Sequence, residues 1–327
     1  MIYQDAIYGS HQITEPVLEA LMETAALQRL QGVLQHGISA LIGVTTPITR
    51  FEHSVGAMLL VRRLGGTLEE QIAALLHDVS HTAFSHVIDY VFNGHNSQSY
   101  HDDRKAEYLA QTDIPAVLAE YGYDWNQFVH EEDFSLLEQP SPRLCADRLD
   151  YFLRDSQGLN LATPADIQNV LDHLVVVDER IAADDLQAAR WLGYTFIKAD
   201  DASWANFREV GLYELTAQAI RRGMEIGLIS EADFWGTDRP LWAKMHACRD
   251  IEMQKLLRLI SPATQFVWDD DEATFQVSTK LRAIDPDVAL AEDLRPLSAL
   301  DPAFARHRAD YIAGKQGMWS MRVIPAF

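Results

Sequence analysis

The sequence is short of cysteine, of positive charge and of long uncharged runs. Two cysteines among 327 residues cannot build a disulfide framework, so a reducing, cytoplasmic setting is expected. Lys and Arg number 27 against 48 Asp and Glu, and the net charge of −21 argues against a broad nucleic-acid-binding face or a membrane surface as the partner. The longest uncharged run, 30–49, contains Gln, Gly and Pro and is not a convincing membrane span. The opening residues lack the basic and apolar regions of a secretory signal.

Neither internal repeats nor low-complexity linkers divide the chain, and a hydrophobic fraction of 48% is enough for a sizeable core. Up to residue 165, apolar residues recur at helical spacing in several segments, namely 15–34, 50–64, 67–76, 103–110 and 143–156. Thr67 is expected to cap the third segment, with Glu69 and Glu70 in its first turn. The pattern predicts a mainly α chain with a helical core over 1–165.

Short β signals occur only in the second half. His173–Val177 is β-branched and Ile181 follows a short turn, which predicts a small hairpin inside a helical extension over 166–261. Apolar residues alternate with polar ones over 275–281, as in a half-buried strand, and 318–324 is the expected partner. The region 262–327 is therefore predicted to form a small α+β C-terminal appendage.

One apolar segment ends in a histidine and an aspartate, His77 and Asp78. Polar groups placed there are costly unless both find partners. A single buried histidine at a helix end is more often hydrogen-bonded in a core, but the adjacent aspartate and histidines in neighbouring segments favour a metal site. Imidazole and carboxylate together suit a divalent metal such as Mn, Fe, Zn, Co or Ni, with Mg as a further candidate. Two His and two Asp would leave positions open for water and a phosphate oxygen, as a catalytic site requires.

Three segments carry a joint pattern: Arg50-Phe51-Glu52-His53-Ser54, then Leu76-His77-Asp78-Val79-Ser80-His81-Thr82-Ala83-Phe84-Ser85-His86, then Asp147-Arg148-Leu149-Asp150-Tyr151-Phe152-Leu153-Arg154-Asp155. In this order they resemble the HD-domain metal-dependent phosphohydrolases, most closely the deoxynucleoside triphosphate triphosphohydrolase branch. The opening Asp5–Gly9 and the segment 27–30 also resemble that branch. The resemblance covers residues 1–160 and fades beyond 170. It implies an HD-domain helical bundle and a homo-oligomer, with a dimer favoured.

The resemblance also implies a metal-binding set made of His53, His77, Asp78 and Asp147, with Asp78 counted among the catalytic residues as well. Asp147 is preferred to Asp150 because the family's ligand lies four residues before a tyrosine, here Tyr151. Asp150 is left to brace a neighbour.

Proton transfer and substrate contacts follow from the same resemblance. His81 would protonate the leaving group, with a purely hydrogen-bonding role as the alternative. His101 would assist proton transfer, and His86 is equally a supporting or a structural residue. The predicted substrate-binding residues are Gln35 for a sugar, Arg50 and Arg148 for phosphate, and Tyr151 and Asp155, which share a helix face with Asp147. Lys198 and Arg208 are further candidates, with solvated surface charge as the favoured interpretation.

The chain departs from the triphosphohydrolase pattern over 198–212, where that branch carries a basic and aromatic cluster. Asp200, Val210 and Gly211 stand where basic groups are expected. A triphosphate needs several cationic or metal contacts, so this departure disfavours a triphosphate substrate.

The expected function is hydrolysis of a nucleotide or a related small phosphate ester by metal-activated water. Three alternatives stay open. They are a dNTP triphosphohydrolase that releases tripolyphosphate, a di-iron HD oxygenase in which His81, His86 and His101 bind a second metal, and a non-catalytic HD module that binds a nucleotide. A cyclic-dinucleotide phosphodiesterase is disfavoured because no Gly-Tyr-Pro type of motif is found.

Overall fold

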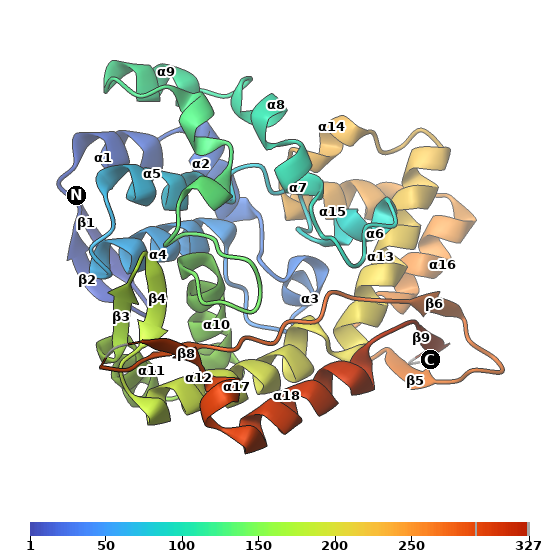
Figure 1. Ribbon diagram of the computed structural model, residues 1–327. Helices are drawn as coiled ribbons and strands as arrows, with labels where there is room; N and C mark the ends of the chain where they lie inside the picture. The colour runs from blue at the N-terminus through green and yellow to red at the C-terminus, as the bar shows by residue number, and fades with distance from the viewer. Residues whose placement is uncertain (292, 326–327) are drawn as a thin grey trace.

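The computed structural model describes residues 1–291 and 293–325, and helices make up most of these residues (Figure 1). The mainly α prediction is therefore confirmed. The first half consists of a hairpin and a series of helices: β1 (Ile2–Asp5), β2 (Gly9–Gln12), α1 (Pro16–Met22), α2 (Ala25–Arg29), η1 (Leu30–Gly32), α3 (Gly37–Leu41), α4 (Arg50–Arg63), α5 (Leu68–Leu76), α6 (Val87–Val91), α7 (Tyr100–Asp103), α8 (Lys105–Leu109), α9 (Ile114–Glu120), η2 (Trp125–Phe128), η3 (Glu131–Asp133) and α10 (Ala146–Gly158).

The second half mixes longer helices with short strands. Its elements are α11 (Pro164–Asp172), β3 (Leu174–Val177), β4 (Arg180–Ala183), α12 (Leu186–Ala199), the π-helix η4 (Asp200–Trp204), α13 (Phe207–Glu225), α14 (Glu231–Phe234), α15 (Asp238–Ala247), α16 (Ile251–Leu259), β5 (Gln265–Trp268), β6 (Phe275–Val277), β7 (Asp287–Ala289), β8 (Leu294–Pro296), α17 (Leu297–Leu300), α18 (Pro302–Lys315) and β9 (Trp319–Ile324).

The strands of the second half form two sheets, β3-β4-β7-β8 and β5-β9-β6. The predicted hairpin is β3–β4, and the predicted strand partners are β6 and β9, in which Val277 lies opposite Trp319. Both pairings are present, but the strand predicted over 275–281 already ends at Val277. However, β4 pairs in parallel with β7, so one sheet joins chain on either side of residue 262. The division into 1–165, 166–261 and 262–327 stays a prediction, and residues 292 and 326–327 of its last part lie outside the described residues.

Local sequence explains where the helices near the site begin. Thr49 starts α4 and Thr67 starts α5, each in a reciprocal capping box with the glutamate three residues later. The predicted single helix over 15–34 is broken, because the Thr24 hydroxyl accepts a hydrogen bond from the Leu27 N–H and begins α2. The predicted helix over 103–110 is likewise divided between α7 and α8.

Helix α4 lies in the core, where it packs against α5 and α10 (Figure 1). Gly56 lies at the crossing with α10. A Cβ at this position would overlap the side chains of Asp150 and Arg154, so only glycine lets those two charged groups lie against α4. Cys145 and Cys248 are both free thiols. Among the described residues, no helix combines the length and the apolar character needed to cross a membrane.

Candidate active site

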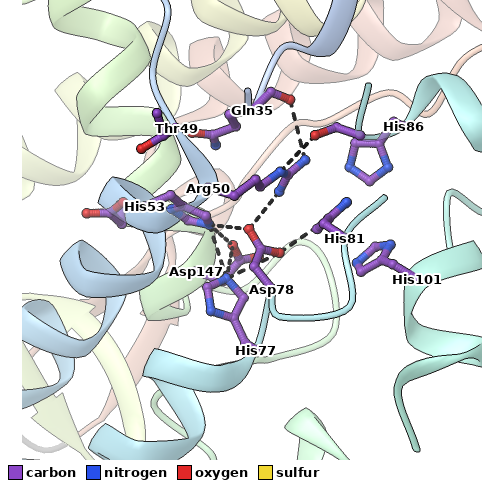
Figure 2. Close-up of polar contacts among 12 residues, drawn as sticks. Gln35, Thr49, Arg50, His53, His77, Asp78, His81, His86, His101 and Asp147 are labelled. Atoms are coloured by element: carbon purple, nitrogen blue, oxygen red, sulfur yellow. Dashed lines mark hydrogen bonds and ion pairs between the residues drawn. The ribbon is translucent and has the colours of Figure 1, made fainter. Parts of the chain in front are cut away.

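Side chains from three helical segments meet at one point (Figure 2). His53 comes from α4, His77 and Asp78 follow directly after α5, and Asp147 lies in the first turn of α10. The Nε2 atoms of His53 and His77 are 3.1 Å apart, and Asp147 Oδ1 lies 2.9 Å and 3.5 Å from them. Oxygens of Asp78 lie 3.7 Å from His53 Nε2 and 3.6 Å from His77 Nε2. The four residues predicted to bind the metal are thus brought together.

The outer nitrogens of both imidazoles are already engaged. His77 Nδ1 donates to the Ala74 carbonyl at 2.7 Å, and His53 Nδ1 lies 2.7 Å from Asp150 Oδ2. A carbonyl and an ionised carboxylate only accept hydrogen bonds, so each Nδ1 carries the proton of its ring. Each Nε2 is therefore the ring nitrogen that remains for a second proton or for a metal ion, and the two Nε2 atoms face each other and two carboxylates. This donor set, with both rings oriented from behind, fits a divalent transition metal.

The charges of this cluster favour an added cation. Burial lowers the pKa of His77, but the Asp78 and Asp147 carboxylates outweigh burial and raise it to about 10. Conversely, burial raises the pKa of Asp147, but hydrogen bonds from His53 and His77 hold it well below its usual range. The carboxylates thus stabilise positive charge at the imidazoles, whether a proton or a metal ion supplies it.

Asp150 has the bracing role that the sequence predicts. Its carboxylate holds His53 on one side and receives Arg154 Nε at 2.7 Å on the other. Arg154 in turn donates to Asp5 at 2.8 Å, which connects the N-terminal hairpin to the cluster. All of these side chains are buried. Because each charge has a partner of opposite sign, the chain from Asp5 to His53 fixes the orientation of the His53 ring.

Three further histidines gather beside Asp78 (Figure 2). His81 Nε2 lies 3.2 Å from Asp78 Oδ1, the His81 ring stacks on His101 with centroids 3.6 Å apart, and His86 meets His81 edge-on at 5.0 Å. Burial lowers the pKa of His81 well below its usual value and that of His101 to about 3, so both rings are neutral at pH 7. Within the described residues, His81 Nδ1 has no hydrogen-bond partner. Asp78, His81 and His101 form a second potential metal-binding group.

A cavity of about 720 Å³ opens beside the cluster and contains most of the predicted contacts. Of the predicted site residues, its lining includes Gln35, Arg50, His77, Asp78, His81, His86, His101, Asp147, Arg148 and Tyr151. His53 is buried behind it, with 1% of its side chain exposed against 24% for Asp147. The cluster is therefore open to the cavity on the Asp147 side.

Arg50 and Arg148, which were predicted to contact phosphate, bind acceptors of the protein itself. Arg50 donates to Asp78 at 2.8 Å and to the Gln35 carbonyl at 3.4 Å. Arg148 donates to the Gln139 carbonyl at 3.2 Å and to Glu138 at 3.1 Å. Both arginines line the cavity, yet each guanidinium already has a carboxylate partner.

Asp155 does not lie among the residues that line the cavity. Its oxygens accept hydrogen bonds from His36 at 2.8 Å and from the Trp204 indole at 2.7 Å, and these two partners do line the cavity. The structure thus places Asp155 behind the wall, as a support. Lys198 is exposed outside the cavity, and Arg208 binds the Pro262 carbonyl. Both fit the interpretation of these two as surface charges.

Sequence reasoning missed several lining residues. Glu138 and Glu209 are acidic, and Lys280 and Arg282 are cations supplied from far along the chain. Lys280 and Arg282 lie at the end of the strand predicted in the C-terminal region, and these two basic residues were the signal that could have indicated a binding role. They could not be placed at the site, because no local rule says where that segment packs.

Comparison with known proteins agrees with this geometry. The HD-domain family model matches residues 50–154. The protein named "Metal-dependent phosphohydrolase cns2" from Cordyceps militaris is 37% identical over 324 residues, which is 96% of this chain and 93% of that protein. The uncharacterised protein YdhJ from Bacillus subtilis is 40% identical over 89% of each chain. A Dictyostelium discoideum protein named as a deoxynucleoside triphosphate triphosphohydrolase homolog is 25% identical over 55% of this chain and 40% of its own length.

Solved structures show the same fold. A phosphohydrolase from Bacteroides thetaiotaomicron superposes with a TM-score of 0.72 over 98% of this chain and 99% of that one, at 16% identity. A hypothetical protein from Aquifex aeolicus superposes with a TM-score of 0.71 over 93% of both chains, at 17% identity. The similarity extends over the C-terminal region as well as the segment matched by the family model.

Proposed function

The chain belongs to the HD-domain metal-dependent phosphohydrolases, and from that premise we propose that it hydrolyses a nucleotide or a related small phosphate ester, with His53, His77, Asp78 and Asp147 as the metal ligands. One observation carries the ligand assignment. The Nε2 atoms of His53 and His77 are 3.1 Å apart, and each ring has its proton on the other nitrogen. Two lone pairs this close repel each other, so the contact needs positive charge, and a divalent metal ion held by both rings and the nearby carboxylates can supply it in place of a proton.

The bound ion would polarise the phosphate and lower the pKa of its water. Arg50, fixed by Asp78, would stabilise the charge on the phosphoryl oxygens. His81 would deliver a proton to the leaving group from Nδ1, the ring atom that has no partner within the described residues. A phosphate dianion next to His81 raises the pKa of the ring and lets it take up that proton. His101, stacked on His81, would hold the ring in place.

We propose a phosphate monoester as the substrate rather than a triphosphate. Several carboxylates besides the ligands line the cavity, Glu131, Glu138 and Glu209 among them. Among the described residues, four Lys and Arg side chains line the cavity, fewer than the carboxylates, and two of them, Arg50 and Arg148, are already paired with Asp78 and Glu138. A triphosphate with about four negative charges would meet net repulsion here, whereas a monoester dianion is offset by one divalent ion.

The test combines elemental analysis of the purified protein with a phosphate-release screen over nucleoside mono-, di- and triphosphates and sugar phosphates. We expect bound divalent metal and release of inorganic phosphate from a monoester. Asp147→Ala should abolish release, and Asp271→Ala, which changes an exposed aspartate, should not. Unchanged hydrolysis by Asp147→Ala would contradict the proposal. Tripolyphosphate as the product would favour the triphosphohydrolase instead.

A dinuclear site is a second candidate, since donor atoms of Asp78, His81 and His101 all lie within 4.8 Å of one another. Asp78 would then contact both ions. Two irons per chain and substrate oxidation that requires oxygen would support the oxygenase alternative. One ion per chain and phosphate release under anaerobic conditions would support the hydrolase. A cytoplasmic location and a dimeric state remain proposals, and light scattering during gel filtration tests the second.

A further inference from the structure

The cavity has a wall that comes from outside the segment matched by the family model. Residues 279–284, which we call the strap, follow β6, and Figure 1 shows the chain after β6 running across the molecule. Lys280, Arg282 and Ile284 of the strap line the same cavity as Asp78 and Asp147. The strap therefore faces the proposed substrate site from a distant part of the sequence.

The two strap cations differ from the other cations of this cavity. Arg50 and Arg148 each pair with a carboxylate at 2.8 Å and 3.1 Å. Among the described residues, neither Lys280 nor Arg282 forms an ion pair. Lys280 Nζ donates to the Ser97 carbonyl at 3.4 Å, and the Arg282 guanidinium donates to the Gln98 side chain and the Lys280 carbonyl. In a protein with 48 acidic residues against 27 basic ones, two neighbouring cations without a carboxylate partner are unexpected.

The strap is held in place before any ligand arrives. The Tyr90 hydroxyl donates to Thr279 at 3.1 Å, and the Arg282 backbone N–H donates to Asp200 at 3.0 Å. At the far end, Arg308 donates to the carbonyls of Ala283 and Ile284 at 3.2 Å. None of these bonds uses the Lys280 ammonium or the Arg282 guanidinium. Both charged groups therefore stay available to a ligand while the backbone of the strap is fixed.

We propose that Lys280 and Arg282 form an anion subsite that binds the phosphoryl oxygens of the substrate in the cavity that Asp78 and Asp147 also line. The repulsion between two neighbouring cations is relieved when an anion binds between them, and a guanidinium presents paired N–H donors that match phosphate oxygens. The strap then supplies two cationic contacts for one phosphoryl group, fewer than the several that a triphosphate needs. The inference rests on the proposed function, since it names residues for the same substrate.

The experiment measures binding rather than turnover. Inorganic phosphate is titrated calorimetrically into the metal-loaded full-length protein and into Lys280→Met, Arg282→Met and the double variant. Methionine keeps the aliphatic bulk and removes the charge. Each single change should weaken phosphate binding by about 10-fold, since a hydrogen bond to a charged group is lost. Metal content should stay at the wild-type level. Arg295→Met, on the exposed surface of β8, is the matched control and should bind phosphate as the wild type does.

Arg282→Lys guards against a folding artefact, because it keeps the charge while changing the geometry. It should keep most of the affinity that Arg282→Met loses. Phosphate affinity unchanged in the double variant, or absent from the wild type, overturns the subsite. A wild type that binds phosphate through these residues but hydrolyses no ester leaves the subsite standing and refutes the hydrolase. If the protein hydrolyses an ester and the strap variants bind phosphate as the wild type does, the hydrolase stands and the subsite is refuted.

Discussion

The two walls of the cavity use charge in opposite ways. On the helical wall, within residues 50–154, Arg50 and Arg148 are each paired with a carboxylate, as is Arg154 behind it, and the histidines are oriented by hydrogen bonds. On the strap, Lys280 and Arg282 have no ion-pair partner among the described residues. Paired charges hold side chains in position, and unpaired ones remain available to a ligand. We therefore propose metal positioning for the first wall and anion binding for the second.

The largest effect should come from the helical wall, at His77. Replacing it by alanine removes one of two facing Nε2 donors, so the protein should lose its metal. Hydrolysis should fall on the order of 10³-fold, beyond the ~10–100-fold expected for the loss of a supporting residue. Metal content and phosphate release check this together. His246→Ala, an exposed histidine of α15, is the control and should change neither quantity. Full metal content in His77→Ala would break the comparison.

The next effect tests whether the paired charges act through position. Asp150→Asn weakens the hydrogen bond to His53 Nδ1 and leaves the proposed ligand atoms unchanged. It should lower metal affinity by ~10–100-fold, and excess metal should restore activity. Asp172→Asn, which alters a surface pair with Arg63, should leave metal affinity unchanged. Asp5→Asn acts one step further away, through Arg154, and should have a smaller effect than Asp150→Asn. Equal metal affinity in all these variants would contradict the positioning role.

On the strap side, Asp200 provides a test by pH. Burial raises the pKa of Asp200 to about 6, so this carboxyl is neutral only below about that pH, and its Oδ1 has no partner in the described part of the chain. Because Asp200 keeps its proton to a higher pH in the folded state than in the unfolded state, it makes the free energy of unfolding fall as pH rises from about 4 to 6. Asp200→Asn removes that slope. Its stability relative to wild type should rise by about 1 kcal/mol between pH 5 and pH 7, measured by urea unfolding. A pH-independent difference would contradict this account.

The smallest effect is expected at the support of Asp200. The Tyr311 hydroxyl donates to Asp200 Oδ2 at 2.8 Å, and Tyr311→Phe removes only that bond. Stability should fall by about 0.5–1 kcal/mol. Metal content should be unchanged, because the Tyr311 hydroxyl donates to Asp200 and not to a proposed metal ligand. Thermal unfolding and elemental analysis measure the two quantities. Loss of metal in Tyr311→Phe would show that the two walls are not independent.

Much of the helical wall could be predicted because its signals are local. Thr67 and Glu70 form a capping box within one turn, and His77-Asp78 follow a helix whose end the apolar pattern marks. The bracing role of Asp150 follows from its offset from Asp147 on one helix. Prediction was weaker where a side chain had a choice of partners. Arg148 lines the cavity as expected, but nearby carbonyls and Glu138 compete for its guanidinium, and Asp155 binds His36 and Trp204 behind the wall.

From the sequence alone came the helical character, the family resemblance and the four residues whose Nε2 and carboxylate atoms converge, since these depend on periodicity and on motifs within short segments. Only the tertiary structure shows which charged side chains form ion pairs and which do not among the described residues. Lys280 and Arg282 reach the cavity through contacts with Tyr90, Gln98, Asp200 and Arg308. Such long-range packing produces no periodic pattern in the sequence. Whether a charged side chain has a partner depends on which residues surround it after the chain has folded.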